Sequence, residues 1–171
     1  MEIKKGALDV KLVGGNTRKW ATDTVTIGTG AAHAAGDVVS TDAGEVLEFA
    51  TGLTAGQSGI ILSSLVTLNQ NAVFAAGAGY TLHLFDESPT AQATNAAFDL
   101  SAADMAKYIG KITIGTLVDL GATCAVTDIG HNFDFTLVSA DTKLYGKLVC
   151  NGAETTIDGK IITINLGIAV L

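Results

Sequence analysis

The sequence predicts an all-β fold: a jelly-roll-like sandwich or barrel of about eight strands with one short helix. The chain has 171 residues, which fits one domain. Hydrophobic residues make up 48% and charged residues 16%, a composition that excludes a disordered protein. Twenty glycines and a single proline suit many short strands joined by small-residue turns. A parallel sheet is disfavoured, because it would need a helix between successive strands and almost no helical pattern is present.

The predicted strands are runs that alternate polar and apolar residues or are rich in β-branched residues and leucine. They are residues 23–27, 37–40, 45–49, 59–68, 80–85, 111–117, 124–129, 133–138, 144–150 and 160–171. One helix is predicted, over about residues 101–109. Ser101 and Asp104 form a start that resembles a capping box, and Gly110 is a plausible stop.

Charge divides the chain into a basic N-terminal arm, residues 1–20, and one β-domain, residues 21–171. Residues 1–19 hold five of the ten basic residues and have a net charge of +3, whereas residues 20–106 hold nine carboxylates and no Lys or Arg. The arm is predicted to be extended and to dock on an acidic partner or a neighbouring copy, in the way that a strand adds to a sheet edge. The alternative is a solvated tail. The residues predicted to contact the capsid or another protomer are Ile3, Lys4, Lys5, Lys11, Arg18, Lys19 and Trp20.

The formal charge of −7 argues against binding to nucleic acid, because neutralising phosphates needs a basic face. We find neither a secretory signal nor an apolar run long enough for a transmembrane helix, so a membrane association is not expected. Cys124 and Cys150 match neither a zinc-site spacing nor a dense disulfide framework. They are predicted to be reduced and to pack as small apolar side chains.

The sequence predicts no catalytic residues, no cofactor and no metal site, and hence a protein that is not an enzyme. His33, His83 and His131 lack the His-x-His pair that a metal-dependent jelly-roll enzyme would need, although separated histidines can meet at a metal in space. The G-T-G at residues 28–30 lacks the third glycine and the helix of a dinucleotide site, so it is interpreted as a turn.

An ordered series of short segments resembles a family of small virion proteins of tailed bacteriophages. The segments are residues 36–39 (GDVV), 58–61 (SGII), 84–89 (LFDESP), 95–98 (NAAF), 104–110 (DMAKYIG), 144–149 (LYGKLV) and 164–168 (INLGI). Their order carries the resemblance, which covers about residues 22–171. The basic N-terminal segment departs from this pattern.

The resemblance implies a capsid decoration, or cement, protein of jelly-roll type. Such a protein would be made in the cytoplasm of the host bacterium and would bind the major capsid protein on the outer surface of the virion, as a homotrimer that stabilises the shell. Deletion of residues 1–19 is expected to abolish this binding and to leave a folded core. Two alternatives remain: a tail- or fibre-associated module that binds glycans, and a metal-dependent jelly-roll enzyme.

Overall fold

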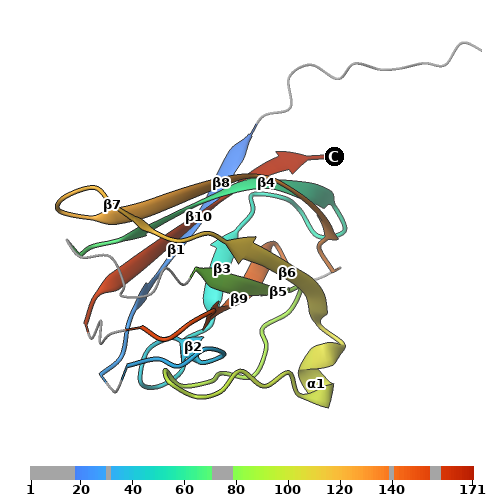
Figure 1. The fold of residues 1–171 in the computed structure, drawn as a ribbon. Coiled ribbons are helices and arrows are strands. Elements are labelled where there is room, and N and C mark those ends of the chain that lie inside the picture. The colour runs from blue at the N-terminus through green and yellow to red at the C-terminus, as the bar shows by residue number, and fades with distance from the viewer. Residues whose placement is uncertain (1–17, 30–31, 71–78, 139–140, 155–158) are drawn as a thin grey trace, which may run out of the picture.

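The computed structural model describes residues 18–29, 32–70, 79–138, 141–154 and 159–171, which form two packed antiparallel sheets (Figure 1). The first sheet contains, in spatial order, β1 (Lys19–Thr26), β10 (Ile161–Val170), β4 (Ser58–Leu68), β8 (Cys124–Thr136) and β7 (Val118–Asp119). The second contains β2 (Val38–Val39), β9 (Lys143–Cys150), β5 (Tyr80–Phe85) and β6 (Tyr108–Ile114), and β3 (Leu47–Ala50) also pairs with β9. The predicted all-β sandwich is confirmed.

The strand order is that of a jelly roll. The first described strand pairs with the last one, β2 and β3 pair with β9, β4 pairs with β8, and β5 pairs with β6. The chain therefore folds back on itself as one long antiparallel ribbon, and rolling that ribbon up places alternate parts of it in opposite sheets. The sequence places alternating apolar residues on every long strand, so each strand can bury one side.

The core lies between the two sheets and is built from their inward side chains. Aliphatic residues from β10 and β4 meet aromatic and aliphatic residues from β3, β5 and β9. Fully buried examples are Phe49, Ile61, Val66, Leu82, Leu84, Ile114, Leu144, Ile162, Ile164, Leu166 and Ile168.

The helix is shorter than predicted. It is α1 (Ala102–Met105), with the Ser101 hydroxyl accepting a hydrogen bond from the backbone N–H of Asp104. The chain does not continue as a helix to Ile109, because residues from Tyr108 onward pair with β5, with an irregularity at Ile109. Gly110 lies within this strand at φ +142°, where an added Cβ would meet the ring of Phe133. The close approach of Phe133, rather than a helix stop, thus accounts for this glycine.

The two predicted strands at 124–129 and 133–138 form one strand, β8. Gly130 and Asn132 have positive φ values of 82° and 47°, and the pairing with β4 skips one residue between Ile61 and Ser63. This irregularity bends the strand without ending it, as a β-bulge does. Gly130 and the polar residues after it therefore lie within the strand, although the sequence predicted a break there.

Strand β1 begins within the predicted arm, since Lys19 pairs with Ile168 and Trp20 with Gly167. The predicted contact residues Ile3, Lys4, Lys5 and Lys11 lie outside the described residues. Lys19 also donates a hydrogen bond to the carbonyl of Gly52, 2.9 Å away. A deletion of residues 1–19 would therefore remove the first residue of β1, whereas a deletion of residues 1–17 leaves β1 whole.

Neither Cys124 nor Cys150 forms a disulfide, and both are buried, as predicted. Burial raises the pKa of the Cys150 thiol to about 12, which keeps it protonated and unreactive at neutral pH. Within the described ranges, no helix has the length and apolar character needed to cross a membrane.

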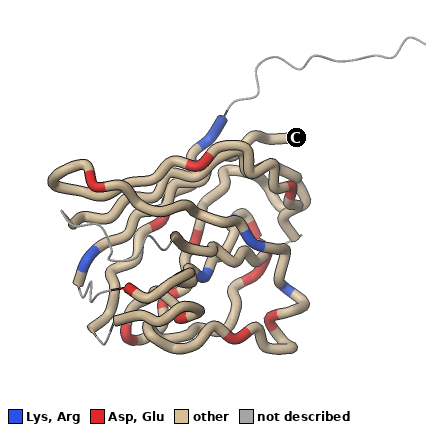
Figure 2. Tube along the Cα trace, in the orientation of Figure 1, with Lys and Arg blue, Asp and Glu red and all other residues tan. Residues whose placement is uncertain are grey.

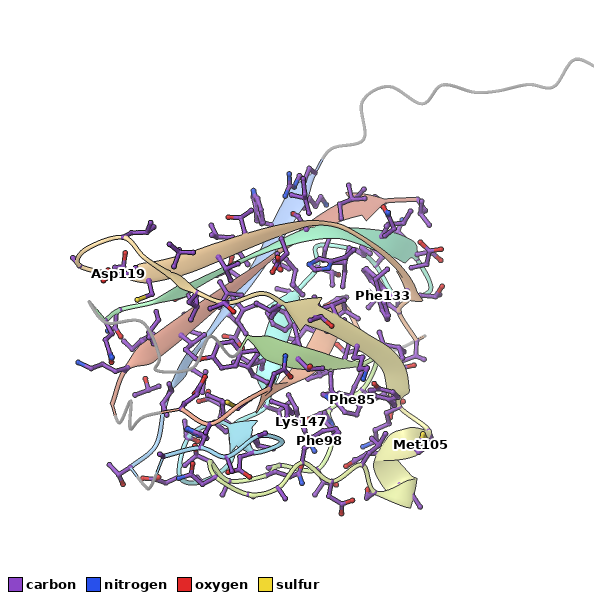
Figure 3. All side chains as sticks on the ribbon, viewed as in Figure 1. Phe85, Phe98, Met105, Asp119, Phe133 and Lys147 are labelled. Carbon is purple, nitrogen blue, oxygen red and sulfur yellow. The ribbon has the colours of Figure 1, made fainter. Side chains whose placement is uncertain are left out.

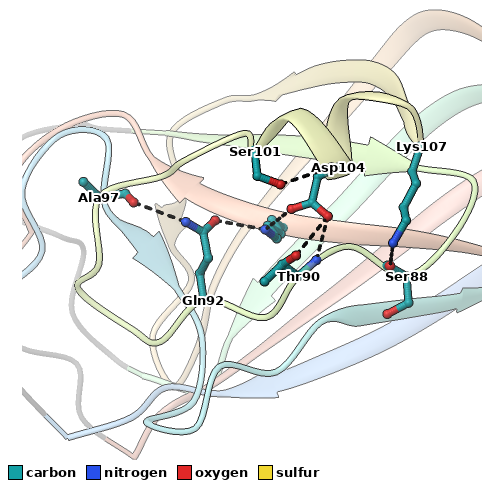
Figure 4. Close-up of polar contacts among 8 residues, drawn as sticks. Ser88, Thr90, Gln92, Ala97, Ser101, Asp104 and Lys107 are labelled. Carbon is teal, nitrogen blue, oxygen red and sulfur yellow. Dashed lines mark hydrogen bonds and ion pairs between the residues drawn. The ribbon is translucent and has the colours of Figure 1, made fainter.

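The outer face of the second sheet is covered by the connection between β5 and β6, residues 86–107, through a buried ion pair (Figure 4). Lys147 on β9 lies 3.8 Å from Asp104 of α1 and 3.0 Å from the amide oxygen of Gln92. Thr90 donates to Asp104 from its backbone N–H and its hydroxyl. Burial alone would raise the pKa of Asp104, but hydrogen bonding from Thr90 and Ser101 outweighs it and holds that pKa below its ordinary value. The charges thereby fasten the connection to the sheet.

An aromatic cluster surrounds this pair. The ring of His83 on β5 stacks on Phe98 at 4.0 Å, and its Nδ1 lies 3.2 Å from the hydroxyl of Tyr108. The ammonium of Lys147 lies 5.9 Å from the centre of the Phe98 ring. Burial, with Lys111 and Lys147 nearby, lowers the pKa of His83 to about 4. His83 is therefore neutral at physiological pH.

We expect Asp104→Asn to lower the free energy of unfolding by about 3 kcal/mol, because it leaves the buried ammonium of Lys147 without its counter-charge. The double variant Asp104→Asn/Lys147→Met is expected to lose less than the sum of the two single variants in urea denaturation. Additive losses would contradict the ion pair. Since the pKa of Asp104 is depressed in the folded state, its contribution is present above the ordinary aspartate pKa and is lost as the pH falls through the lower, folded value.

A second acid-sensitive contribution should come from His83 at higher pH. Its folded pKa is lowered from 6.5 to about 4, so the folded state resists protonation and stability is lost as the pH falls through this window. We expect His83→Phe, which keeps a ring against Phe98, to show a shallower fall of Tm between pH 6.5 and pH 4 than the parent chain. An equal slope in both proteins would show that His83 does not titrate in this way.

Candidate interaction surface

The outer face of the first sheet is a regular array of small uncharged side chains, which we call the threonine face. Cross-strand pairing aligns these side chains in rows: Thr24 with Thr163 and Thr67, and Thr22 with Asn165 and Leu65. Residues that pair directly in antiparallel strands project on the same side. The face comprises Thr22, Thr24, Thr26, Leu65, Thr67, Ala125, Thr127, Thr163 and Asn165.

This surface differs from an ordinary solvated sheet face by its lack of charge. Threonine suits strands because of its β-branched side chain, but that preference does not account for the absence of Lys and Glu from positions that face water. On the outward side of β1, β10, β4 and β8 the only charged position is Asp134, near one end. Covering hydroxyl and methyl groups costs far less than desolvating ions, so this face is suited to contact with another protein.

Arg18 and Trp20 form a cation–aromatic contact at one end of the threonine face. The guanidinium of Arg18 lies 4.3 Å from the centre of the Trp20 ring and donates a hydrogen bond to the hydroxyl of Ser63. The guanidinium packs over Gly167, where an added Cβ would lie 2.5 Å from Nε of Arg18. Ile129, 81% exposed, completes the row Trp20–Gly167–Ser63–Ile129. We call Arg18, Trp20, Ser63, Gly167 and Ile129 the Arg18 socket.

The socket presents a positive charge that the described part of the chain does not neutralise. The ion pairs in that part join His33 to Glu154, Lys143 to Glu48, and Lys147 to Asp104. Arg18 instead rests on a ring and a hydroxyl. A guanidinium held in this way has donors left for a carboxylate.

A second exposed feature is the hairpin that joins β7 to β8. Val118 and Leu120 are 59% and 66% exposed and flank Asp119, which projects at the far end of the sheet (Figure 3). The carboxylate of Asp119 accepts a hydrogen bond from the backbone N–H of Gly121, and Leu120 N–H bonds to the carbonyl of Thr123. The turn is thus closed by its own contacts, while its apolar and acidic side chains face outward.

The three histidines lie in different parts of the fold and contact different residues. Nε2 of His33 lies 2.9 Å from the hydroxyl of Thr94, and Nδ1 lies 3.9 Å from Glu154. His83 belongs to the aromatic cluster described above. The described residues contain no group of three or more His, Cys, Asp or Glu that could hold a metal ion.

One pair has the composition of a nucleophile and its base. The hydroxyl of Ser64 lies 2.9 Å from Nε2 of His131, which sequence spacing alone did not reveal. Ser64 is fully buried, so a substrate cannot reach its oxygen. Burial lowers the pKa of His131 and Asp128 only partly offsets the effect, so the ring is neutral at physiological pH. This pair satisfies a buried hydroxyl inside the fold.

Glu154, which follows β9, and Tyr80 on β5 are also buried polar side chains. Glu154 is 2% exposed, and burial raises its pKa although hydrogen bonding to Tyr80 and Cys150 acts in the opposite direction. Burial likewise raises the pKa of Tyr80. Both side chains are enclosed, which suits a structural role rather than acid–base catalysis.

Of the predicted contact residues in the described part of the chain, the structure brings Arg18 and Trp20 together and turns Lys19 toward Gly52. The sequence analysis missed the contributions of Ser63, Gly167 and Ile129. Alternate threonines at 22, 24 and 26 were a visible signal for an uncharged outer face. The row that joins the socket residues depends on pairing between distant strands, which no local pattern contains.

Replacing Gly167 by alanine tests the socket without changing any charge. The new Cβ would overlap the flexible side chains of Arg18 and Ser63, which can move, so we expect Tm to change little. Trp20 is the only tryptophan, so its fluorescence reports directly on the guanidinium beside it. Gly167→Ala and Arg18→Gln should shift the emission in the same direction. Unchanged emission in both variants would rule out the stacked contact.

No protein-family model matches the chain, and no curated protein matches its sequence. Similar solved structures include the PRD1 vertex protein P5, with 16% identity, coverage of 90% of this chain and 98% of that chain, and a TM-score of 0.35. They also include an Israeli acute paralysis virus full particle heated to 63 degrees, with 12% identity, coverage of 90% and 74%, and a TM-score of 0.26. The native virion of Kashmir bee virus at acidic pH is also similar, with 14% identity, coverage of 90% of this chain and 73% of that chain, and a TM-score of 0.24. They are named as a vertex protein and two virus particles. Similarities this low carry no conclusion about activity, and the jelly-roll order above comes from this chain's own strand pairing.

Proposed function

We propose that this chain is a structural, non-enzymatic protein of a bacteriophage particle, a decoration or cement protein that attaches to the outer surface of the capsid and stabilises it. The observation that carries the proposal is the threonine face, a broad sheet surface with almost no charge in a chain of net charge −7. The ordered segments that resemble tailed-phage decoration proteins support the same role. The partners are the major capsid protein and further copies of this chain, in a homotrimer.

The distribution of charge explains why the threonine face is the part suited to attachment. Acidic positions are spread over the body of the molecule, and Lys and Arg are few (Figure 2). A partner approaching most of this surface would have to desolvate carboxylates, which is costly unless each one is paired. The threonine face avoids that cost. Many weak copies of such a contact on a repeating lattice bind firmly together through avidity.

The basic arm is proposed as a second contact. Lys4 and Lys5 lie in the segment that precedes Arg18 in the sequence. Their attraction to acidic groups would be long-ranged at low salt and screened at high salt, which adds to the association rate more than to the final affinity.

The proposal is tested by binding the full-length protein to capsids prepared without it. We expect hundreds of copies to co-sediment with each capsid, and we expect Thr24→Glu/Thr163→Glu, which places two carboxylates in one row of the face, to weaken binding at least tenfold. Asp37→Lys and Asp99→Lys, outside this face, serve as controls for altered charge. A handful of copies, or glycan binding without capsid affinity, would instead indicate a tail- or fibre-associated module.

The arm is tested separately with Lys4→Gln/Lys5→Gln, using Lys111→Gln/Lys160→Gln as a pair with the same change in charge. We expect the arm variant to bind capsids several-fold more weakly at low salt, with the difference shrinking as ionic strength rises. A truncated chain starting at Arg18 keeps β1 whole and tests the entire segment. Full binding by that truncated chain at raised salt would reject a role for the arm.

A further inference from the structure

We infer that copies of this chain associate head to tail, with Asp119 of one copy held in the Arg18 socket of the next. This inference deepens the self-association included in the proposed function by naming the two surfaces and the pair of charges that join them. The two surfaces lie at opposite ends of the first sheet. Their chemistry is complementary in charge.

Each surface carries one exposed charge. The hairpin offers the carboxylate of Asp119, which pairs with Cys124 and therefore lies on the opposite side of the strand from Val118. The socket offers the guanidinium of Arg18 beside Trp20 and Ile129, which are 50% and 81% exposed. A guanidinium and a carboxylate can form two parallel hydrogen bonds, and Trp20 and Ile129 would help to exclude water from them.

A chain cannot close this contact on itself. Asp119 pairs with Cys124 at the start of β8, and Ile129 follows five residues later along that strand. At about 3.3 Å per residue the separation along the strand is roughly 17 Å. Trp20 lies three strands across the sheet, roughly a further 14 Å away at about 4.8 Å between strands. The hairpin and the socket must therefore meet through two different copies.

A contact between two different surfaces repeats from copy to copy and closes a ring where the rotation allows it. The socket occupies one end of the threonine face and the hairpin occupies the opposite, projecting end of the same sheet (Figure 1). Each copy in a ring therefore uses one hairpin and one socket. A closed trimer would satisfy all three of its Arg18 guanidiniums, which the described part of a single chain does not do.

The test is self-association of the full-length protein without capsids, measured by sedimentation velocity over a range of concentrations. We expect a trimer, and we expect Arg18→Glu and Asp119→Arg each to weaken association at least tenfold. The double variant Arg18→Glu/Asp119→Arg restores the opposite charges in reversed positions and should return to within about threefold of the parent chain. Asp119→Asn keeps the acceptor for Gly121 and should weaken association through loss of charge alone.

Glu45→Arg reverses an exposed carboxylate elsewhere and should have no effect, and circular dichroism confirms that each variant is folded. A monomer at every concentration, single reversals without effect, or a double variant no better than the singles would each overturn the head-to-tail contact. Capsid co-sedimentation is measured in parallel. Capsid binding by a protein that remains monomeric would retain the proposed attachment and reject only this inference.

Discussion

The antiparallel pairing of β1 with β10 is the constraint on which the rest of the structure depends. It joins the beginning of the described chain to its end, from Lys19 with Ile168 to Thr26 with Ile161. A slip of one residue would turn the buried Val25 outward and expose the apolar side of the strand. The same register that protects the core therefore brings Trp20 beside Gly167. Core packing and the outer surface are set by one arrangement of hydrogen bonds.

The outer faces of the two sheets differ in what covers them. The second sheet is covered by the chain's own 86–107 connection, held by Lys147 and Asp104. Burying two charges is costly, and they are tolerated because each finds a partner and because few other placements of the connection would satisfy both. The first sheet receives no such cover from the described residues. Its outer side chains are uncharged, so another protein can supply the cover at low cost.

The sequence predicted what local patterns can encode, and it failed where distant strands decide the outcome. Alternation located the long strands, and the burial of Cys124 and Cys150 without a disulfide followed from their spacing and composition. The helix was overextended to Ile109 because pairing with β5 outweighs a modest local preference for helix. The socket was predicted only at Arg18 and Trp20, because the role of Gly167 appears only when β10 lies next to β1.

An acidic chain that is proposed to assemble in many copies has to limit its own repulsion, and the two proposed contacts can do so without competing. The Arg18 socket occupies the row that begins at Trp20, whereas Thr24, Thr163 and Thr67 lie in a row nearer the opposite end of β1. A hairpin seated on Trp20 would therefore leave most of the threonine face open. The neighbour's guanidinium would neutralise the negative charge of Asp119 in the same step, so ring formation removes one source of repulsion at each junction. Self-association and attachment to a capsid thus use different rows of one sheet, and each copy added to a ring would enlarge the uncharged surface offered to the shell.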